Sequence, residues 1–353
     1  MAEAARIPLI HITDLYHPPQ DPDDQFDLAT VLALPELELK AVLFDVTRKF
    51  LVSAPAGWDV KRDPGIVPVA QADYLQGTTI PTGVGPQDPL SSLEDDVSDR
   101  PKREQSAIEL LLDVLRGTSK PVAVSIVGSA RILAATYLRA PELVRAKVTG
   151  VWVNAGSTAQ GELEWNVTLD PIAYRVLWNS GLPVRWFPCA TEKSAFDPEP
   201  ERGTHWSATH ETLLSGLPDH WRGWFAYGLS GSARGDILGA MDALGRGAVW
   251  ENLQAARRSM WSTASLVMMA GRQLVRTEHG WRFEQDTSAS GADPELWPWR
   301  LDPIEAVVDD HAQVSWTETS SPTSHRLFGR RPGAAYGRAM AEALNALLVD
   351  HLN

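Results

Sequence analysis

Cysteine is almost absent from this sequence: Cys189 is the only one among 353 residues. A single cysteine excludes a disulfide framework within the chain and a cysteine-rich zinc site. Long apolar runs are missing as well, since no window reaches the roughly 18 to 20 apolar residues of a membrane span. The first residues, MAEAARIPLIHITD, hold too short an apolar stretch for a signal peptide. We therefore expect a cytoplasmic protein with no membrane partner.

Basic residues are scarce relative to acidic ones. Lys and Arg together number 32 against 45 Asp and Glu, which gives a formal net charge of −13. An acidic chain without a basic block is poorly suited to bind nucleic acid or anionic lipid. Hydrophobic residues at 44% and charged residues at 22% are typical of a globular protein. We expect no nucleic-acid partner.

Tryptophan, by contrast, is abundant. The chain has 14 tryptophans against 6 tyrosines and 8 phenylalanines, and every tryptophan except Trp58 follows residue 150. Broad amphipathic rings are thus concentrated in the second half. We interpret Trp206, Trp221 and Trp224 as ordinary core residues of that part.

Apolar runs and amphipathic segments alternate along the first half of the chain. Residues 7–13 and 37–46 are typical of buried strands, and the apolar positions between residues 24 and 34 follow a helical stripe with Asp23 or Asp24 as its N-cap. A βαβ unit of this kind favours a parallel sheet. The alternation continues with strands expected at 121–128, 148–156 and 182–188, and helices at 104–116, 130–140 and 170–180.

We therefore predict an α/β fold with an open, mostly parallel sheet and flanking helices. A Trp-rich helical C-terminal part follows, with a late β-hairpin at 303–319 and an amphipathic helix at 334–352 that packs on its own core. One domain is expected over 1–353, with a core at 7–187 and a C-terminal elaboration at 188–353. Residues 53–104, rich in Pro, Gly and Asp, predict no regular element.

The strongest candidate for chemistry is an acidic cluster, defined here as Asp14, Asp21, Asp23, Asp24 and Asp27. Asp14 ends the first expected strand, and ligands of open α/β sheets bind outside the carboxyl ends of the strands. Converging carboxylates repel one another unless a proton or a hard cation such as Ca²⁺ holds them. A solvated acidic loop beside an ordinary helix start explains the same residues, and the cluster alone leaves both interpretations open.

Two segments resemble one known family. TDLYHPPQDPDDQFDLATVLAL (residues 13–34) resembles the N-terminal Asp motif of the inosine/uridine-preferring nucleoside hydrolases, in the TD…PDDQ form of their divergent relatives. GELEWNVTLDPIAYRVLWNSGLPV (161–184) is similar to the family's EFN…DPEAA…SGLP block. The resemblance covers roughly residues 7–187 and implies a nucleoside hydrolase-like fold.

The resemblance also implies an activity and a set of roles. The activity is hydrolysis of the N-glycosidic bond of a ribonucleoside or related glycoside by a homodimer or homotetramer that uses Ca²⁺. Asp14 would bind the metal and act as catalytic base, and Asp24 would be a second metal ligand. Asp23, Glu164 and Asn166 would bind the sugar. Such a bond breaks through an oxocarbenium-like state, which carboxylates stabilise.

The sequence departs from the family at three places. Trp261–Ser262 stands where the family has a His–Asp pair, so the last carboxylate ligand is not found, and we expect Trp261 to stack on the ligand. Arg48 and Arg131 stand near the family's AGN and GPLTN motifs. This leads to an alternative hypothesis, a non-catalytic or catalytically altered nucleoside- or sugar-binding protein in which these guanidinium groups replace the cation.

Three histidines, His205, His210 and His220, lie in a Trp-rich stretch. One of them could protonate a leaving base, because an ordinary histidine pKa suits acid–base catalysis. We interpret them instead as surface or structural residues.

Overall fold

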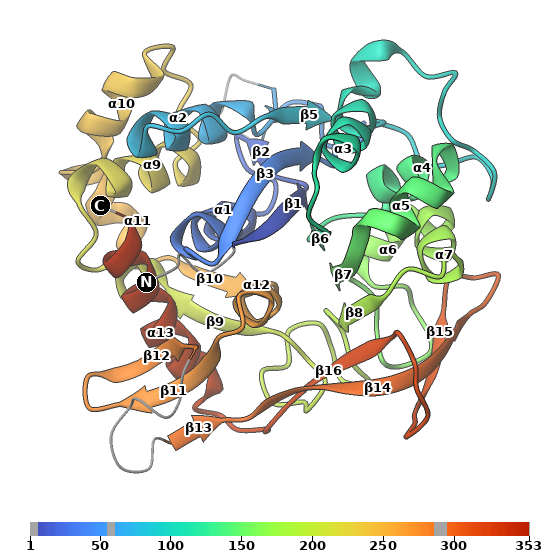
Figure 1. Cartoon of the computed structure of the whole chain (residues 1–353). Helices are drawn as coiled ribbons and strands as arrows, with labels where there is room; N and C mark the ends of the chain where they lie inside the picture. The colour runs from blue at the N-terminus through green and yellow to red at the C-terminus, as the bar shows by residue number, and fades with distance from the viewer. Residues whose placement is uncertain (1–5, 55–60, 286–294, 353) are drawn as a thin grey trace.

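The computed structural model describes residues 6–54, 61–285 and 295–352. A nine-stranded sheet crosses the molecule, with helices on both faces (Figure 1). Its strand order is β15-β14-β16-β8-β7-β6-β1-β3-β5. The strands are β1 (Ile7–Thr13), β3 (Leu37–Phe44), β5 (Thr82–Val84), β6 (Val122–Ile126), β7 (Val148–Asn154), β8 (Val184–Phe187), β14 (Trp299–Val308), β15 (Val314–Glu318) and β16 (Arg326–Arg330).

The sheet is parallel from β5 to β16, and next to this edge β14 pairs antiparallel with both β16 and β15. Parallel strands need apolar residues on both faces, and all five residues of β6 are buried. Successive side chains of β1 enter two separate cores, Leu9 on one face and Ile10 on the other. The predicted α/β fold with a mostly parallel sheet is confirmed.

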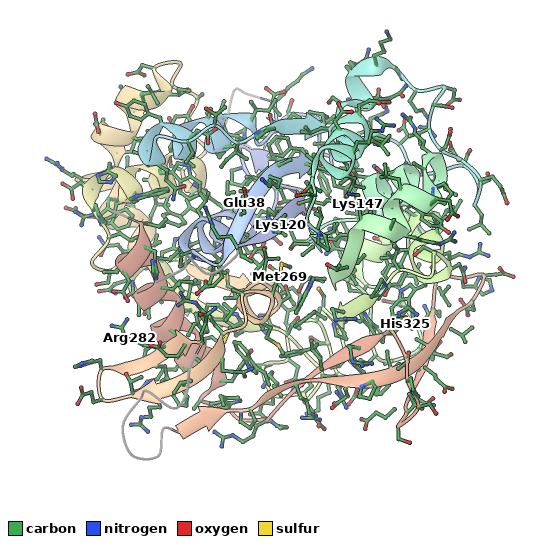
Figure 2. All side chains as sticks on the ribbon, in the orientation of Figure 1. Glu38, Lys120, Lys147, Met269, Arg282 and His325 are labelled. Atoms are coloured by element: carbon green, nitrogen blue, oxygen red, sulfur yellow. The ribbon has the colours of Figure 1, made fainter. Side chains whose placement is uncertain are left out.

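The helices of the first half cover the sheet, and side chains fill the space between the layers (Figure 2). They are α1 (Asp23–Ala33), α2 (Ile66–Gln76), α3 (Ser106–Gly117), α4 (Arg131–Arg139), α5 (Pro141–Lys147), α6 (Trp165–Leu169) and α7 (Pro171–Asn179), with a short 3₁₀ helix η1 (Lys102–Glu104). Of these, α1, α3, α4 and α7 lie at the predicted places. The predicted start of α7 is confirmed, because Asp170 accepts a hydrogen bond from the Ala173 N–H at 2.9 Å and Pro171 follows it.

The predicted cap of α1 is wrong. Its N-cap is Pro22, and Asp23 and Asp24 are the first two helical residues, with no side-chain capping bond. Their carboxylates line a cavity instead of folding back on the helix. Every residue of α1 except Leu32 is buried, so this helix lies inside the molecule rather than on its surface.

Residues 53–104 contain elements that the sequence did not predict. α2 lies here, as do β5 and β4 (Asp63–Pro64), which pairs with β2 (Tyr16–His17). Pro68 in the first turn and a weak segregation of apolar from polar positions hide α2 from a periodicity argument. Its buried residues pack against the C-terminal half of the chain, in particular against α9 (Asp219–Leu229).

The C-terminal half is less helical than predicted, because three of its strands, β14, β15 and β16, extend the central sheet. Its helices are α8 (His210–Leu214), α9, α10 (Ile237–Leu244), α11 (Ala248–Gln254), α12 (Thr263–Met269) and α13 (Tyr336–His351). Its remaining strands are β9 (Trp206–Thr209), β10 (Arg257–Met260), β11 (Gln273–Thr277), β12 (Gly280–Glu284) and β13 (Glu295–Trp297).

Other predictions for this half are confirmed. The late hairpin is β14–β15, and α13 packs on α1, α8, β9 and β12 of its own chain. Trp206, Trp221 and Trp224 are fully buried core residues. Among the described residues, none of the helices is both long enough and apolar enough to cross a membrane.

Candidate functional site

A cavity of about 690 Å³ opens at the carboxyl ends of the parallel strands. Asp14 follows β1, Val127 follows β6, Asn154 ends β7 and Cys189 lies just after β8, and all four line it. This is where ligands bind in open α/β sheets. The whole acidic cluster lines the same cavity, as do Glu164, Asn166, Trp261 and Ser262. Every residue that the sequence nominated for metal or substrate binding thus lies in one place.

Four of the five members of the acidic cluster are buried rather than solvated, and Asp21 is partly exposed. Asp14, Asp24 and Asp27 are 6%, 3% and 1% exposed. Thr13 Oγ1 donates a hydrogen bond to Asp24 Oδ1 at 3.1 Å, and Ser262 Oγ donates one to Asp27 Oδ2. Asp24 Oδ2 and Asp27 Oδ1 are buried without a hydrogen-bond partner. The interpretation of the cluster as a solvated acidic loop is therefore wrong.

Burial and mutual repulsion change how these carboxyl groups ionise. The pKa values of Asp14, Asp23 and Asp24 are raised well above the ordinary value, first by burial and then by neighbouring carboxylates. Burial also raises the pKa of Asp27, to about 7, although the hydrogen bond from Ser262 opposes this. The cluster consequently binds protons or another positive charge strongly.

A further carboxylate, Asp45, stands behind Asp14. It follows β3 and accepts a hydrogen bond from the Ser129 N–H at 2.6 Å. A Cβ at Gly128 would come within 3.0 Å of Asp45 Oδ2 and 3.2 Å of Asp14 Oδ1. Only glycine therefore lets the turn after β6 approach both carboxylates. The charge of Asp45 adds to burial in raising the Asp14 pKa.

The two arginines lie elsewhere than the alternative hypothesis requires. Arg48 forms an exposed ion pair with Asp88 at 2.7 Å. Arg131 is fully buried and donates to Asp170 at 2.9 Å and to the backbone carbonyls of Val46, Pro86 and Leu169. Neither residue lines the cavity. These guanidinium groups do not lie where they could replace the cation, because both are already paired with carboxylates outside the cluster.

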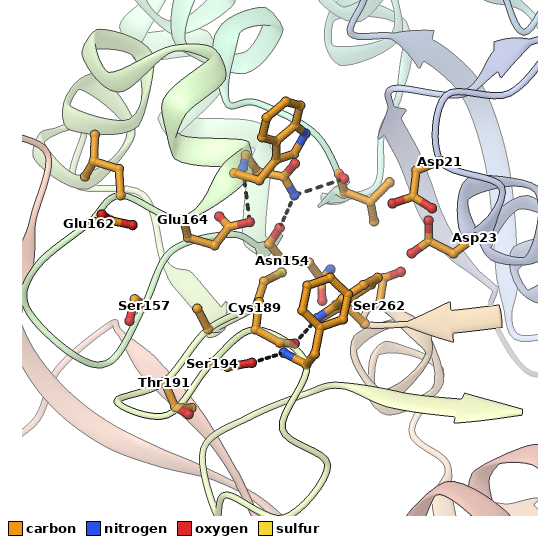
Figure 3. A pocket seen from close by; sticks show the side chains of 18 of the residues that line it. Asp21, Asp23, Asn154, Ser157, Glu162, Glu164, Cys189, Thr191, Ser194 and Ser262 are labelled. Carbon is orange, nitrogen blue, oxygen red and sulfur yellow. Dashed lines mark hydrogen bonds between the residues drawn. The ribbon is translucent and has the colours of Figure 1, made fainter. Parts of the chain in front are cut away.

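Glu164 and Asn166 line the cavity, and both form hydrogen bonds with backbone groups around it. The two oxygens of Glu164 accept hydrogen bonds from the N–H groups of Gly156 at 2.7 Å and Asn166 at 3.0 Å, the second of which caps α6. Burial raises the pKa of Glu164 to about 7. Asn166 Nδ2 donates to the carbonyls of Asn154 at 2.9 Å and Val127 at 3.3 Å, which ties together the ends of β6 and β7 (Figure 3).

Aromatic rings form the outer wall of the cavity. Trp165 and Phe196 are 43% and 64% exposed, although both line it. Trp261 is held in place by a hydrogen bond from its Nε1 to the carbonyl of Ala195 at 2.8 Å, and its ring lies 5.4 Å from that of Phe196. Flat surfaces of this kind suit a planar ligand ring.

Histidine, lysine and arginine are absent from the cavity wall among the described residues. His205 packs behind Trp261 at 5.1 Å between ring centres, and burial lowers the His205 pKa to about 4. Burial also lowers the pKa of His210 to about 4, and its Nδ1 contacts the Leu253 carbonyl. These two side chains are structural, as we interpreted them.

Sequence reasoning gave no individual role to several wall residues. Asp27 is included in the acidic cluster, and it lies one helical turn beyond Asp23 and Asp24 on α1. Asn154 ends a predicted strand at the edge where sites form, and its Oδ1 is buried without a partner. The contact between Asp27 and Ser262 joins positions 235 residues apart, and no local pattern reveals it.

The donor chemistry of the cluster fits a hard cation. It offers unpartnered buried carboxylate oxygens and no competing basic side chain among the described residues. Within 6–54, 61–285 and 295–352, however, no three His, Cys, Asp or Glu side chains are arranged as a metal site. Ca²⁺ takes six to eight oxygens, including carbonyls, hydroxyls and water, so two carboxylates can hold it together with such ligands.

Comparison with known proteins agrees with the resemblance seen in the sequence. No family model matches the chain. The pyrimidine-specific ribonucleoside hydrolase RihA of Enterobacter sp. (strain 638) is 29% identical over 182 residues, which cover 46% of this chain and 55% of that protein. The chain thus matches about half the length of this curated relative.

Solved structures match over almost the whole chain. A purine-preferring ribonucleoside hydrolase from Gardnerella vaginalis has a TM-score of 0.51 and 14% identity, covering 97% of this chain and 99% of that one. A plant nucleoside hydrolase, PpNRh1, has a TM-score of 0.52 and 13% identity, covering 98% of each chain. At these identities the matches show the fold, and the fold is the one that the sequence resemblance implied.

Proposed function

We propose that this chain, which has the fold of the nucleoside hydrolases, cleaves the N-glycosidic bond of a ribonucleoside or related glycoside. The observation that carries the proposal is the buried acidic cluster at the carboxyl ends of the strands, inside a cavity of about 690 Å³. Similarity to RihA and to the two nucleoside hydrolases supports the same reaction.

Asp14 is the proposed catalytic base. Water attacks the anomeric carbon, and one carboxylate oxygen of Asp14 accepts the proton that the water releases. Burial raises the Asp14 pKa, so once deprotonated this carboxylate is a stronger base than an exposed aspartate. The remaining carboxylates stabilise positive charge on the sugar ring as the bond to the leaving group breaks.

The sugar is held by residues on both sides of the cavity. Asp23 accepts hydrogen bonds from sugar hydroxyls, and Glu164 binds the sugar from the opposite wall (Figure 3) together with Asn166, which also lines the cavity. Because Asn166 Nδ2 is already bonded to Asn154 and Val127, we expect its Oδ1 to face the sugar. Trp261 is expected to lie beside the leaving group.

Asp14 and Asp24 are the proposed calcium ligands. When bound, the ion polarises water and anchors the sugar diol. Thr13 holds one oxygen of Asp24 and leaves the other, Oδ2, unpartnered for the ion. Ser262 takes the place of a carboxylate ligand, but its hydroxyl donates to Asp27, so a carboxylate remains adjacent to that position.

A panel of ribonucleosides tests the proposal, with release of free sugar measured in calcium and in chelator. Asp14→Asn should reduce kcat at least a hundredfold, because it removes the base and a metal ligand. Asp242→Asn, an exposed change on α10, is the matched control and should leave the rate unchanged. Failure to release sugar from any nucleoside would refute the hydrolase assignment.

The second candidate function is nucleoside or sugar binding without catalysis. It is favoured by Ser262 at the expected carboxylate position and by the absence of a preassembled metal site among the described residues. Calorimetry in chelator separates the two functions. Tight binding of an intact nucleoside, with no sugar released in calcium, supports the binding protein.

Assembly as a homodimer or homotetramer and a cytoplasmic location complete the proposal, both supported by the family resemblance. Light scattering on the purified protein measures the assembly. A monomer at micromolar concentration would contradict the first part.

A further inference from the structure

We infer that the cavity selects unphosphorylated nucleosides whose aglycone carries a positive charge, such as a pyridinium or an N-alkylated purine. The inference deepens the proposed function and rests on it. Three features of the cavity carry it: the acidic groups of its wall, its exposed aromatic rings and the absence of His, Lys and Tyr from the wall among the described residues.

The wall of the cavity carries carboxyl groups on two opposite sides. In addition to the acidic cluster, Glu162, Glu164 and Glu192 line it, and the described residues contribute no Lys, Arg or His. Figure 3 shows Glu162 and Glu164 on the side opposite Asp21 and Asp23, so a ligand between them faces carboxylates in both directions. One bound divalent cation would neutralise only part of this charge.

Two basic groups interact with wall residues from outside the wall. Lys49 Nζ lies 4.4 Å from the ring centre of Trp165, which shows that this indole accepts a cation. Arg258 donates to His210, and burial lowers the Arg258 pKa, an effect that the charges of Asp21 and Asp23 oppose. Neither group lines the cavity, so a ligand within it meets no positive protein side chain among the described residues.

The side-chain amide oxygen of Asn154 has no hydrogen-bond partner, which indicates that a ligand completes this cavity. Asn154 is 1% exposed and lines it, and its Nδ2 donates to Ser265 Oγ at 2.8 Å. Its Oδ1 is buried without a partner. A buried acceptor without a donor is costly, so a donor supplied by the ligand is expected here.

The outer wall offers a surface for a flat cation. Trp165 and Phe196 are the two most exposed aromatic rings of the cavity, at 43% and 64%. A planar cationic ring gains cation–π attraction from such faces in addition to burial. The aromatic residues and the acidic wall therefore favour the same ligand.

The protonation that a leaving group requires also favours a cationic aglycone. A neutral base must gain a proton as it leaves, and because the described wall contains no His, Lys or Tyr, that proton would have to come from one of the carboxyl groups. With a cationic aglycone the water oxygen bonds to the anomeric carbon, and the C–N electron pair moves onto the ring nitrogen. The ring leaves neutral, and the proton of the water passes to Asp14. No leaving-group acid is needed.

The same charge disfavours phosphorylated ligands. A 5′-phosphate would bring up to two negative charges into a cavity that has no basic side chain among the described residues to receive them. Like charges in a partly desolvated site are strongly unfavourable. Nucleotides and sugar phosphates are expected to bind weakly.

Matched ligands test the inference. Nicotinamide riboside is compared with its neutral dihydro form, 7-methylguanosine with guanosine, and nicotinamide riboside with its 5′-phosphate. Calorimetry on Asp14→Asn measures Kd without turnover, so the intrinsic lability of cationic aglycones does not enter. The cationic member of each pair should bind at least tenfold tighter, and the phosphate should weaken binding at least tenfold.

Charge variants supply the control. The double variant Glu162→Gln/Glu192→Gln should reduce the preference for the cation at least threefold, whereas Glu142→Gln on α5, outside the cavity, should not change it. Equal binding of cationic and neutral partners overturns the inference. It then leaves hydrolysis of neutral nucleosides intact. Preferential binding of cations without sugar release from any nucleoside overturns the proposed function while the charge selection stands.

Discussion

The buried ion pair between Arg131 and Asp170 gives a stability prediction that can be worked out from its contacts. Both side chains are fully buried, and Arg131 Nε donates to Asp170 Oδ2 at 2.9 Å. The same oxygen accepts from the Leu90 N–H, and Asp170 Oδ1 accepts from the Ala173 N–H that caps α7. Removing the guanidinium leaves a buried carboxylate and several backbone carbonyls without their donor.

Arg131→Met keeps most of the side-chain volume and removes the charge. Breaking a buried pair in this way costs about 3–5 kcal/mol. For a chain of 353 residues the entropy of unfolding near 60 °C is about 0.7 kcal/mol per kelvin, so the melting temperature should fall by about 5 °C. Urea unfolding and differential scanning calorimetry measure the two quantities.

Arg48→Met is the matched control, because it breaks an ion pair of the same chemistry that is exposed to solvent. It should leave the melting temperature nearly unchanged. An Arg131→Met variant that melts within 1 °C of the parent, or as far below it as Arg48→Met, would refute the reasoning. The arginine would then not be stabilising the turn between β6 and α4 through this pair.

Three further predictions concern the site and the core. The pKa of Asp27 is about 7 in the folded protein against an ordinary 3.8, so its contribution to stability is complete below pH 3.8 and is lost as the pH rises through 7. Asp27→Asn should remove up to about 4 kcal/mol of this pH-dependent loss, measured by urea unfolding in chelator. Identical pH profiles of the variant and the parent would contradict this. Ser262→Asp places a carboxylate beside Asp27, so the melting temperature of the variant should fall below that of the parent in chelator and rise in millimolar calcium. A melting temperature independent of calcium would exclude a metal here. Trp224→Ala should cost about 3–5 kcal/mol by urea unfolding, because the indole is fully buried and its Nε1 donates to the Pro68 carbonyl; a loss below 1 kcal/mol would show that the site collapses.

Much of the fold could be predicted because its signals are local. Apolar runs of strand length, the Asp170–Pro171 helix start and the late hairpin depend only on neighbouring residues, and each is present. The addition of β16 to the sheet was not predictable, because Leu327 pairs with Trp186 across a long interval of sequence. Likewise α2 owes its helical state to packing rather than to its own pattern.

The candidate site divides in the same way. Asp14, Asp23 and Asp24 follow from their place after a strand, and the structure brings them together with Glu164 and Asn166 at one cavity. Their metal and substrate roles remain predictions. The sequence did not show which side chains would pair with one another across long intervals of the chain.

The positions of the two arginines depend on the carboxylates with which they form ion pairs. Arg48 and Arg131 stand near the motifs of the site, but each had several carboxylates within reach in principle. Folding paired the first with Asp88 at the surface and the second with Asp170 in the core. Such long-range pairings depend on the completed packing, which no local pattern encodes.

The packing of α13 on α1 has a consequence for how the protein is made. The helix α1, which bears most of the acidic cluster, is covered in part by α13, a helix that is synthesised much later. Until residues 336–351 emerge, α1 lacks part of its apolar cover, and its face stays open to chaperones and proteases.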